Sequence, residues 1–312
     1  MTNPFINSPD FFEQKISSMY VVHGDQKFIT HGDGQGDRGV WNAAGQVQGL
    51  WDAPVKTTWK TGAFQDGSTM KSKKVLHRDL SLGFHVTETA DKTAEENESE
   101  FRKLFDYEVD QWDDDALPTT LHVETRQSGV RKLDVLLSDT PVFEPELDPI
   151  QQQYFNLLLK LRAGQPMWYE DPVITSASGA GTSGTLQIEV SNPTDQMMRH
   201  KWILTRADWT IPDVSWKGAR GSRAPGGVHA ARTIPVPVAN GCVISLNKME
   251  IMARDVNYTN MLPLLGGRLF MHVIPPYTPS QTLTVSYTNA PAGGAMAQLV
   301  QPRCWSRPWG LE

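Results

Sequence analysis

Apolar and polar side chains alternate along much of this chain, and a period of two residues predicts strands with one buried face. Thr282–Thr288 is the clearest example, because Leu283, Val285 and Tyr287 point one way and the polar residues between them point the other. In the second half of the chain the same pattern predicts strands at 185–190, 201–205, 209–211, 243–252, 268–274 and 282–288. Several short strands with turn residues between them favour a β-sandwich.

The first half of the chain shows the same alternation, and its turn residues predict two hairpins. Gly24-Asp25-Gln26 joins one pair of strands, and Gln127-Ser128-Gly129 joins another. The predicted strands are 19–23, 27–30, 79–87, 119–126, 130–137 and 150–162. The last of these also fits a helix, because residues 157–159 are all leucine, but the turn residues at 163–166 favour the strand.

One long helix stands out from this β pattern. Thr93 and Glu96 have the spacing of a capping box, in which each residue accepts a hydrogen bond from the backbone N–H of the other. Apolar residues follow at helical spacing as far as Phe105, and we predict a helix from about 94 to 107. A short helix with Pro at its first position is also predicted after Ser8.

The distribution of glycine and serine predicts two domains. Residues 176–184 are almost entirely Gly, Ala, Ser and Thr, and such a segment has little to pack into a core, so it predicts a flexible linker. We therefore expect a first domain at 1–175, mostly strands with one helix, and a β-sandwich at 185–300. Residues 301–312 would form a separate C-terminal tail. A chain of 312 residues agrees with two domains of about 100–200 residues each.

Composition narrows the class of protein further. The 25 glycines and 21 prolines suit a turn-rich β protein. The formal net charge of −6 gives no overall attraction to nucleic acid. Two cysteines exclude a disulfide framework or a four-cysteine zinc site, and free thiols are the simpler interpretation. We find no apolar run long enough for a membrane span and no signal-peptide pattern, so we expect a soluble protein that is made in the cytosol.

Motifs for catalysis or ligand binding are weak. Two matches to G-x-G-x-x-G occur, at 34–39 and 179–184, but a strand pattern follows each where a dinucleotide site requires a helix. Asp33 and Asp37 lack the ligand spacing of a Ca²⁺ loop. The eight histidines include no helical metal-site pair, and no G-x-S-x-G nucleophile motif occurs. We therefore predict that the protein is not an enzyme and has no catalytic, metal-binding or cofactor-binding residues.

Charged and aromatic segments remain as candidate contact surfaces. The acidic stretch comprises Glu95, Glu96, Glu98, Glu100, Asp106, Glu108, Asp110, Asp113, Asp114 and Asp115, and such a run is typical of a solvated helix face. The basic, Gly-rich segment 217–232 contains Arg220, Arg223 and Arg232 and is interpreted as a mobile loop or an inter-subunit contact. Trp305, Arg307 and Trp309 crowd the C-terminal tail and need a partner surface.

A family resemblance spans the chain from Trp51 onward. It rests on an ordered set of short motifs: Trp51-Asp52-Ala53-Pro54-Val55-Lys56-Thr57, Leu76-His77-Arg78-Asp79-Leu80, Asn192-Pro193-Thr194-Asp195, Lys201-Trp202-Ile203-Leu204-Thr205, Leu264-Leu265-Gly266-Gly267-Arg268-Leu269-Phe270, Ile274-Pro275-Pro276 and Arg303-Cys304-Trp305-Ser306-Arg307-Pro308-Trp309-Gly310. With this set the chain resembles the distal tail proteins, or Dit-like minor tail proteins, of long non-contractile-tailed bacteriophages of the actinobacteriophage type. Cys304 stands where the family pattern has a second Arg.

The resemblance implies a mainly β fold, with an N-terminal β-barrel-like belt domain that bears one α-helix and a C-terminal galectin-like β-sandwich. It implies a structural virion protein that forms a homo-hexameric ring at the distal end of the phage tail. Such a ring joins the tail tube protein to the hub and tip proteins, and genomic DNA passes through its lumen without specific binding. In some relatives the last residues return to the first domain, which would give Trp305 and Trp309 their partner.

Three hypotheses about the surfaces remain open at this point. The acidic helix region and the basic segment 217–232 would meet across neighbouring subunits, or the acidic residues, Asp113–Asp115 among them, would line the lumen. An alternative function is a carbohydrate-binding module that contacts the host cell envelope, with Trp209 and Trp216 as an aromatic platform. The third hypothesis is an envelope hydrolase. Such an enzyme needs a convergent carboxylate or metal cluster, and the sequence shows none.

Overall fold

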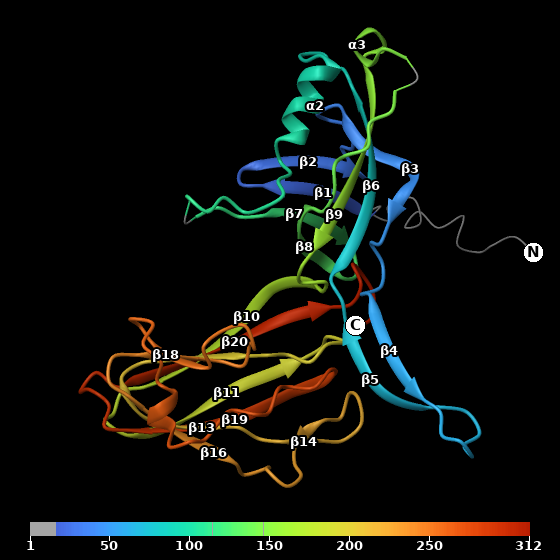
Figure 1. Cartoon of the computed structure of the whole chain (residues 1–312). Coiled ribbons are helices and arrows are strands. Elements are labelled where there is room, and N and C mark those ends of the chain that lie inside the picture. Colours follow the sequence, from blue (N-terminus) through green and yellow to red (C-terminus); the bar gives the residue numbers. More distant parts are fainter. Residues whose placement is uncertain (1–16, 114, 146) are drawn as a thin grey trace, which may run out of the picture. The chain divides into compact units, whose positions relative to one another are not determined.

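The computed structural model describes residues 17–312, except residues 114 and 146, and it consists mainly of β-strands (Figure 1). The chain divides into two compact units. Unit 1 contains the described residues up to Trp168 together with Ser306–Leu311, and unit 2 contains Tyr169–Trp305. The predicted mainly β class is confirmed, whereas the short helix predicted after Ser8 lies outside the described residues. Within the part of the chain that is described, no helix has the length and apolar character needed to cross a membrane.

Unit 1 is a curled antiparallel sheet that carries a helix. Its strands are β1 (Ser18–His23), β2 (Gln26–His31), β3 (Val40–Gln48), β4 (Val55–Lys60), β5 (Thr69–Val75), β6 (Arg78–Thr87), β7 (Thr119–Thr125), β8 (Gly129–Leu137) and β9 (Tyr154–Ala163). Neighbouring strands follow the order β3-β6-β9-β8-β7-β1-β2, while β4 and β5 form a separate two-stranded sheet. Both predicted hairpins, β1–β2 and β7–β8, are confirmed.

One aromatic side chain shows how far the sheet of unit 1 curls. Phe101 of the helix α2 (Ala94–Arg102) lies 5.2 Å from Phe28 of β2 and 4.8 Å from Phe84 of β6, measured between ring centroids. These strands stand near opposite ends of the strand order. A sheet whose distant strands contact the same buried ring must wrap around a shared core, which agrees with the barrel-like first domain that the resemblance implies.

The helix α2 begins as predicted and ends earlier. Thr93 Oγ1 accepts a hydrogen bond from Glu96 N, and the Glu96 carboxylate accepts one from Thr93 N at 2.8 Å, so the capping box is confirmed. The predicted end near residue 107 is wrong, because the helix stops at Arg102 and the guanidinium of Arg102 donates to Phe105 O at 2.8 Å. Phe105 is still buried, which explains why the helical apolar pattern extends past the end of the helix.

A second helix in unit 1 shortens a predicted strand. The helix α3 (Pro149–Gln152) has Asp148 as its N-cap, and the Asp148 carboxylate accepts a hydrogen bond from Ile150 N at 3.0 Å. Gln153 then adopts a positive φ of 49° and ends the turn. The predicted strand 150–162 therefore starts only at Tyr154 and continues to Ala163 as β9.

Unit 2 is a β-sandwich. Its elements are β10 (Trp168–Gly179), β11 (Gly184–Asn192), β12 (Lys201–Leu204), β13 (Ala207–Pro212), β14 (Trp216–Lys217), β15 (Ala224–Pro225), β16 (Thr233–Val238), β17 (Cys242–Ser245), β18 (Ala253–Asp255), the 3₁₀ helix η1 (Leu262–Leu265), β19 (Thr278–Thr288) and β20 (Ala295–Trp305). One sheet has the order β18-β17-β12-β20-β10, and the other has the order β11-β19-β13-β16. Trp202, Trp209 and Val285 are buried in the core of this unit, which confirms the predicted C-terminal sandwich.

The glycine- and serine-rich segment has a different role from the one we predicted. Residues 176–179 complete β10, and residues 180–183 form a turn into β11 in the other sheet of unit 2. A Cβ atom at Gly179 would lie 2.2 Å from the hydroxyl of Tyr287. The small residues here permit close packing, and the division between the units falls at Trp168–Tyr169. The predicted tail at 301–312 is also divided, because residues up to Trp305 belong to β20.

Two other predicted strands are wrong in whole or in part. Residues 268–274 form no named strand, because side chains bind their backbone: Asp213 accepts hydrogen bonds from Met271 N and His272 N, and Arg232 donates to Leu269 O. The predicted strand 243–252 ends at Ser245, since the side chain of Asn247 then accepts a hydrogen bond from Met249 N and forms a turn.

Candidate functional site

The C-terminal strap, Ser306–Leu311, is held on unit 1 by two buried arginines. Arg78, at the start of β6, is 1% exposed. Its Nη2 donates to Ser306 O and its Nε to Pro166 O, both at 2.9 Å, and its Nη1 lies 2.9–3.3 Å from the carbonyl oxygens of residues 49–52. One guanidinium thereby connects three separate segments of unit 1.

The second arginine, Arg131 on β8, is 0% exposed. Its Nη1 donates to Arg307 O at 3.1 Å and to Gly310 O at 2.9 Å, and Ser128 Oγ accepts a hydrogen bond from Gly310 N. A buried charge is unfavourable unless it is hydrogen-bonded. Burial lowers the pKa of Arg78 to about 10, which still leaves that guanidinium charged at neutral pH. The carbonyl oxygens around it compensate for the lost hydration.

Side chains of the strap add contacts to unit 1. Arg307 forms a bidentate pair with Asp52, with Nε–Oδ1 at 2.5 Å and Nη2–Oδ2 at 3.0 Å, and these hydrogen bonds hold the pKa of the Asp52 carboxyl below its usual value. The ring centroid of Trp309 lies 4.0 Å from that of Trp51. Trp305, by contrast, is a buried residue of β20 in unit 2. The sequence singled out Arg307 and Trp309, but it did not indicate Arg78 or Arg131 as the residues that hold them.

The arginines of the basic segment 217–232 bind mainly within unit 2. Arg232 forms an ion pair with the buried carboxylate of Asp213, with Nη1 and Oδ2 3.4 Å apart, and donates to Leu269 O at 2.7 Å. Arg223 donates to Pro276 O. Arg220 lies over the ring of Tyr277, 5.3 Å from its centroid, and is exposed. Two of the three arginines that we predicted as neighbour contacts therefore position loops of their own unit.

The two tryptophans proposed as a sugar platform are not exposed platforms. Trp209 is 1% exposed and donates from Nε1 to Thr205 O at 2.7 Å. The alternation of β13 places it between the two sheets, 5.3 Å from the ring of Tyr287. Trp216 is half-buried and packs against the same core. Burial excludes Trp209 as a ring that could stack on a sugar, so of the two predicted platform residues only the half-buried Trp216 keeps part of its ring accessible.

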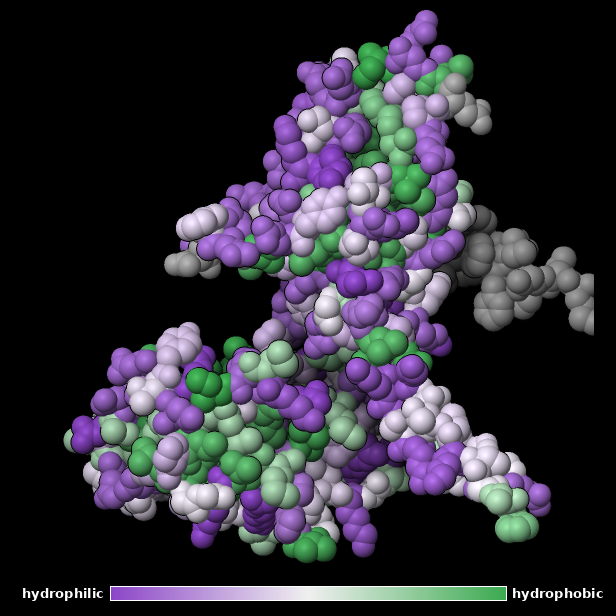
Figure 2. All heavy atoms as spheres, viewed as in Figure 1, coloured by the Kyte–Doolittle hydropathy of each residue, from purple (hydrophilic) through white to green (hydrophobic). Residues whose placement is uncertain are grey.

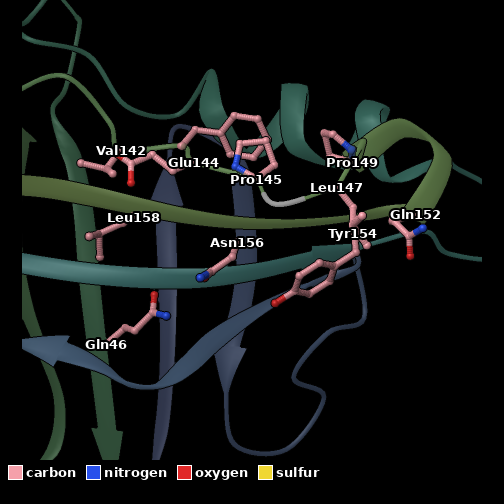
Figure 3. A pocket seen from close by; sticks show the side chains of 11 residues that line it. Gln46, Val142, Glu144, Pro145, Leu147, Pro149, Gln152, Tyr154, Asn156 and Leu158 are labelled. Carbon is pink, nitrogen blue, oxygen red and sulfur yellow. The ribbon is translucent and has the colours of Figure 1, made fainter.

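Unit 1 has a groove beside β9. Its volume is about 570 Å³, and Val142, Pro145 and Leu158 are among its apolar lining residues. Figure 3 shows Gln46 of β3 and Asn156 of β9 with their amide groups directed toward one another across one side of the groove. Glu144 is the one charged residue among the described lining residues. The groove therefore has the chemistry of a contact surface.

The two cysteine thiols are largely buried, and two of the histidines are paired with each other. Burial raises the pKa of the Cys242 thiol to about 11 and that of the Cys304 thiol to about 11, so neither is a thiolate at neutral pH. His229 Nδ1 and His272 Nε2 lie 2.9 Å apart and share a hydrogen bond. Among the residues that the structure describes, no three or more His, Cys, Asp or Glu side chains are grouped so that they could hold a metal ion.

Comparison with known proteins shows which of them this chain is similar to. No protein-family model matches the chain. The minor tail proteins Gp27 of Mycobacterium phage D29 and Mycobacterium phage L5 are each 24% identical to it over 344 aligned residues, which cover 95% of this chain and 98% of each relative. The crystal structure of the SPP1 Dit (gp 19.1) protein superposes with a TM-score of 0.54 and 12% identity, over 92% of this chain and 99% of that one.

This chain resembles bacteriophage minor tail proteins and has a Dit-like fold. The match to two minor tail proteins over nearly their whole length, together with the shared fold of SPP1 Dit, confirms the family resemblance that the sequence motifs indicated. These findings support a structural protein of the bacteriophage virion that belongs to the tail. Its candidate functional features are accordingly surfaces for assembly, namely the strap, the basic segment 217–232, the acidic stretch and the groove.

Proposed function

We propose that this Dit-like protein forms a hexameric ring at the distal end of the tail, where it joins the tail tube protein to the hub and tip proteins. Genomic DNA would pass through the lumen of the ring without specific binding. The observation that supports this function most is the match to SPP1 Dit over 92% of this chain. That protein is described as a paradigm of a hub adsorption apparatus.

A ring of identical subunits places physical demands on the chain. Such a ring repeats one heterologous interface, so each subunit must present two different and complementary surfaces. The formal charges of unit 1 are unevenly distributed, with an acidic stretch after α2 and a lysine-rich hairpin at β4–β5.

The first test is the mass of the purified protein in solution, with negative-stain images of the same sample. A ring should have about six times the 34.8 kDa mass of one chain and show six-fold symmetry in projection. A closed ring with another number of subunits would contradict the hexamer and leave the position in the tail as a separate question.

The position in the virion is tested independently of assembly in solution. Gold-labelled antibody against the protein should bind at the distal end of the tail on intact phage particles, in one cluster per virion. A label on the capsid, or one spread along the tail tube, would refute the proposed position whatever the solution mass.

A further inference from the structure

The hairpin β4–β5 is an exposed element of unit 1 with no strand beside it. Val55–Lys60 and Thr69–Val75 pair with each other in a sheet of their own, and each residue of both strands except Val75 is exposed. Figure 1 shows this hairpin extending away from the other strands of unit 1. Phe64, at its tip, is fully exposed. An isolated two-stranded hairpin is marginally stable in water.

The register divides the hairpin into two chemically different faces. Val55, Trp59 and Met70, each about half exposed, share one face, on which Trp59 lies directly opposite Met70. Thr57 and Lys73 form a polar pair on the same face, between the apolar residues. Lys56 and Lys74 lie directly opposite each other on the second face. Figure 2 shows hydrophilic and intermediate side chains along the projecting hairpin and hydrophobic ones near its tip.

Neither face is favourable in water alone. Exposed apolar side chains gain free energy only when they are covered, and like charges directly opposite across two strands repel each other. Residues 55–75 contain five lysines and one acidic residue, Asp66. The hairpin therefore suits a partner surface that offers negative charge beside apolar side chains.

Unit 1 itself carries a surface of that composition. The acidic loop, residues 106–113 and 115–117, follows α2, and residues 104–117 of the sequence include six acidic residues and no basic one. Trp112 is 97% exposed, and Tyr107 and Leu117 are also exposed. In Figure 1 the acidic loop leaves unit 1 on the left, while the hairpin leaves it at the lower right. The two surfaces of one unit 1 are therefore far apart.

We propose that the β4–β5 hairpin of one subunit docks on the acidic loop of a second copy of this chain. Charge complementarity selects the orientation, and the aromatic side chains of both surfaces become buried together. A contact between two different surfaces of identical chains is heterologous, and repetition of this contact closes a ring or extends a filament. The inference rests on the proposed self-assembly and specifies which residues form the contact.

The test uses two charge-reversed full-length chains. The hairpin variant carries Lys56→Glu, Lys60→Glu and Lys74→Glu. Positions 56 and 74 then still carry like charges opposite each other, so the repulsion between them is nearly unchanged. The loop variant carries Asp110→Lys, Asp113→Lys and Asp115→Lys. A control carries Arg206→Glu, Lys248→Glu and Arg268→Glu on exposed positions of unit 2 and changes the net charge as much as the hairpin variant does.

Each variant alone should need at least a tenfold higher protein concentration to associate, and an equimolar mixture should associate as the unchanged chain does. In the mixture every reversed hairpin meets a reversed loop and every unchanged hairpin meets an unchanged loop, so alternating rings satisfy all contacts. The control should associate normally. Rings that form equally well from the hairpin variant alone would overturn this inference and leave the proposed ring intact.

A second measurement decides the matter if the unchanged chain stays monomeric in solution. A photo-crosslinking residue in place of Trp59 is carried into assembled phage tails, and the crosslinked peptides are identified by mass spectrometry. A crosslink to residues 106–117 of another copy supports the inference. A crosslink to the tail tube, to a hub protein or to DNA overturns it, because the hairpin would then serve a different class of partner.

Discussion

Arg78 makes the most specific prediction about stability, because a single guanidinium connects three segments of unit 1. The perturbation is Arg78→Met, which keeps most of the aliphatic volume and removes all five donors. Three carbonyl oxygens that now accept hydrogen bonds at 2.9 Å, those of Leu50, Pro166 and Ser306, would remain buried or half-buried with a donor lost.

The magnitude follows from two opposing terms. Each buried carbonyl without its donor costs about 1–3 kcal/mol. The substitution also removes the unfavourable burial of a charge, and the fall in the pKa of Arg78 to about 10 sets that term at roughly 3 kcal/mol. Three unpaired carbonyls cost about 6 kcal/mol at the middle of that range, and the relief of roughly 3 kcal/mol leaves an expected fall of about 3 kcal/mol in the free energy of unfolding.

Urea denaturation followed by tryptophan fluorescence measures that loss, and limited proteolysis with mass spectrometry measures release of the C-terminal strap. Arg162→Met is the matched control, because Arg162 lies on β9 beside β6 and forms an exposed ion pair with Asp79. That control should lose less than about 1 kcal/mol. If Arg78→Met lost no more than the control and kept the strap resistant to protease, the connecting role of Arg78 would be wrong.

Three further predictions concern single contacts. Burial lowers the pKa of His200 from 6.5 to about 4, so the unfolded chain binds a proton near pH 6 that the folded chain does not. The free energy of unfolding should thus fall by about 2 kcal/mol from pH 7.5 to pH 5, and an equal pH dependence in His200→Phe would contradict this. Thr93→Ala should lose about 1 kcal/mol with the capping box; an unchanged urea midpoint would disagree. Gly179→Ala should lose about 1–3 kcal/mol through overlap with the Tyr287 hydroxyl, and Tyr287→Phe should restore part of it; no restoration would exclude that overlap.

Short patterns in the sequence determined the strands and helix starts that depend on residues close together in the chain. The alternation of Leu283, Val285 and Tyr287 predicted β19 because a strand turns each second side chain to the same face. The capping box at Thr93 predicted the start of α2 because both partners lie within one helical turn. Ordered short motifs across the chain also indicated the tail-protein family, which the full-length relatives confirm.

The tertiary structure decided each feature whose partners are distant in the sequence. The glycines at 179–184 were interpreted as a linker, but Gly179 is small because the hydroxyl of Tyr287 occupies the adjacent space. Asp213 binds the backbone of residues 271–272 and thereby prevents the strand that the local pattern favoured. In each case a contact across 50 residues or more outweighs the local preference.

The assembly surfaces show the same division. Arg307 and Trp309 were recognisable as residues that need a partner, because charged and aromatic side chains crowd a short segment. Arg78 and Arg131 were not recognisable, since an arginine is ordinarily exposed and is buried only where backbone carbonyls converge on it. That convergence brings Ser306 next to a strand that begins at residue 78, and only the folded chain places those carbonyl oxygens around one guanidinium.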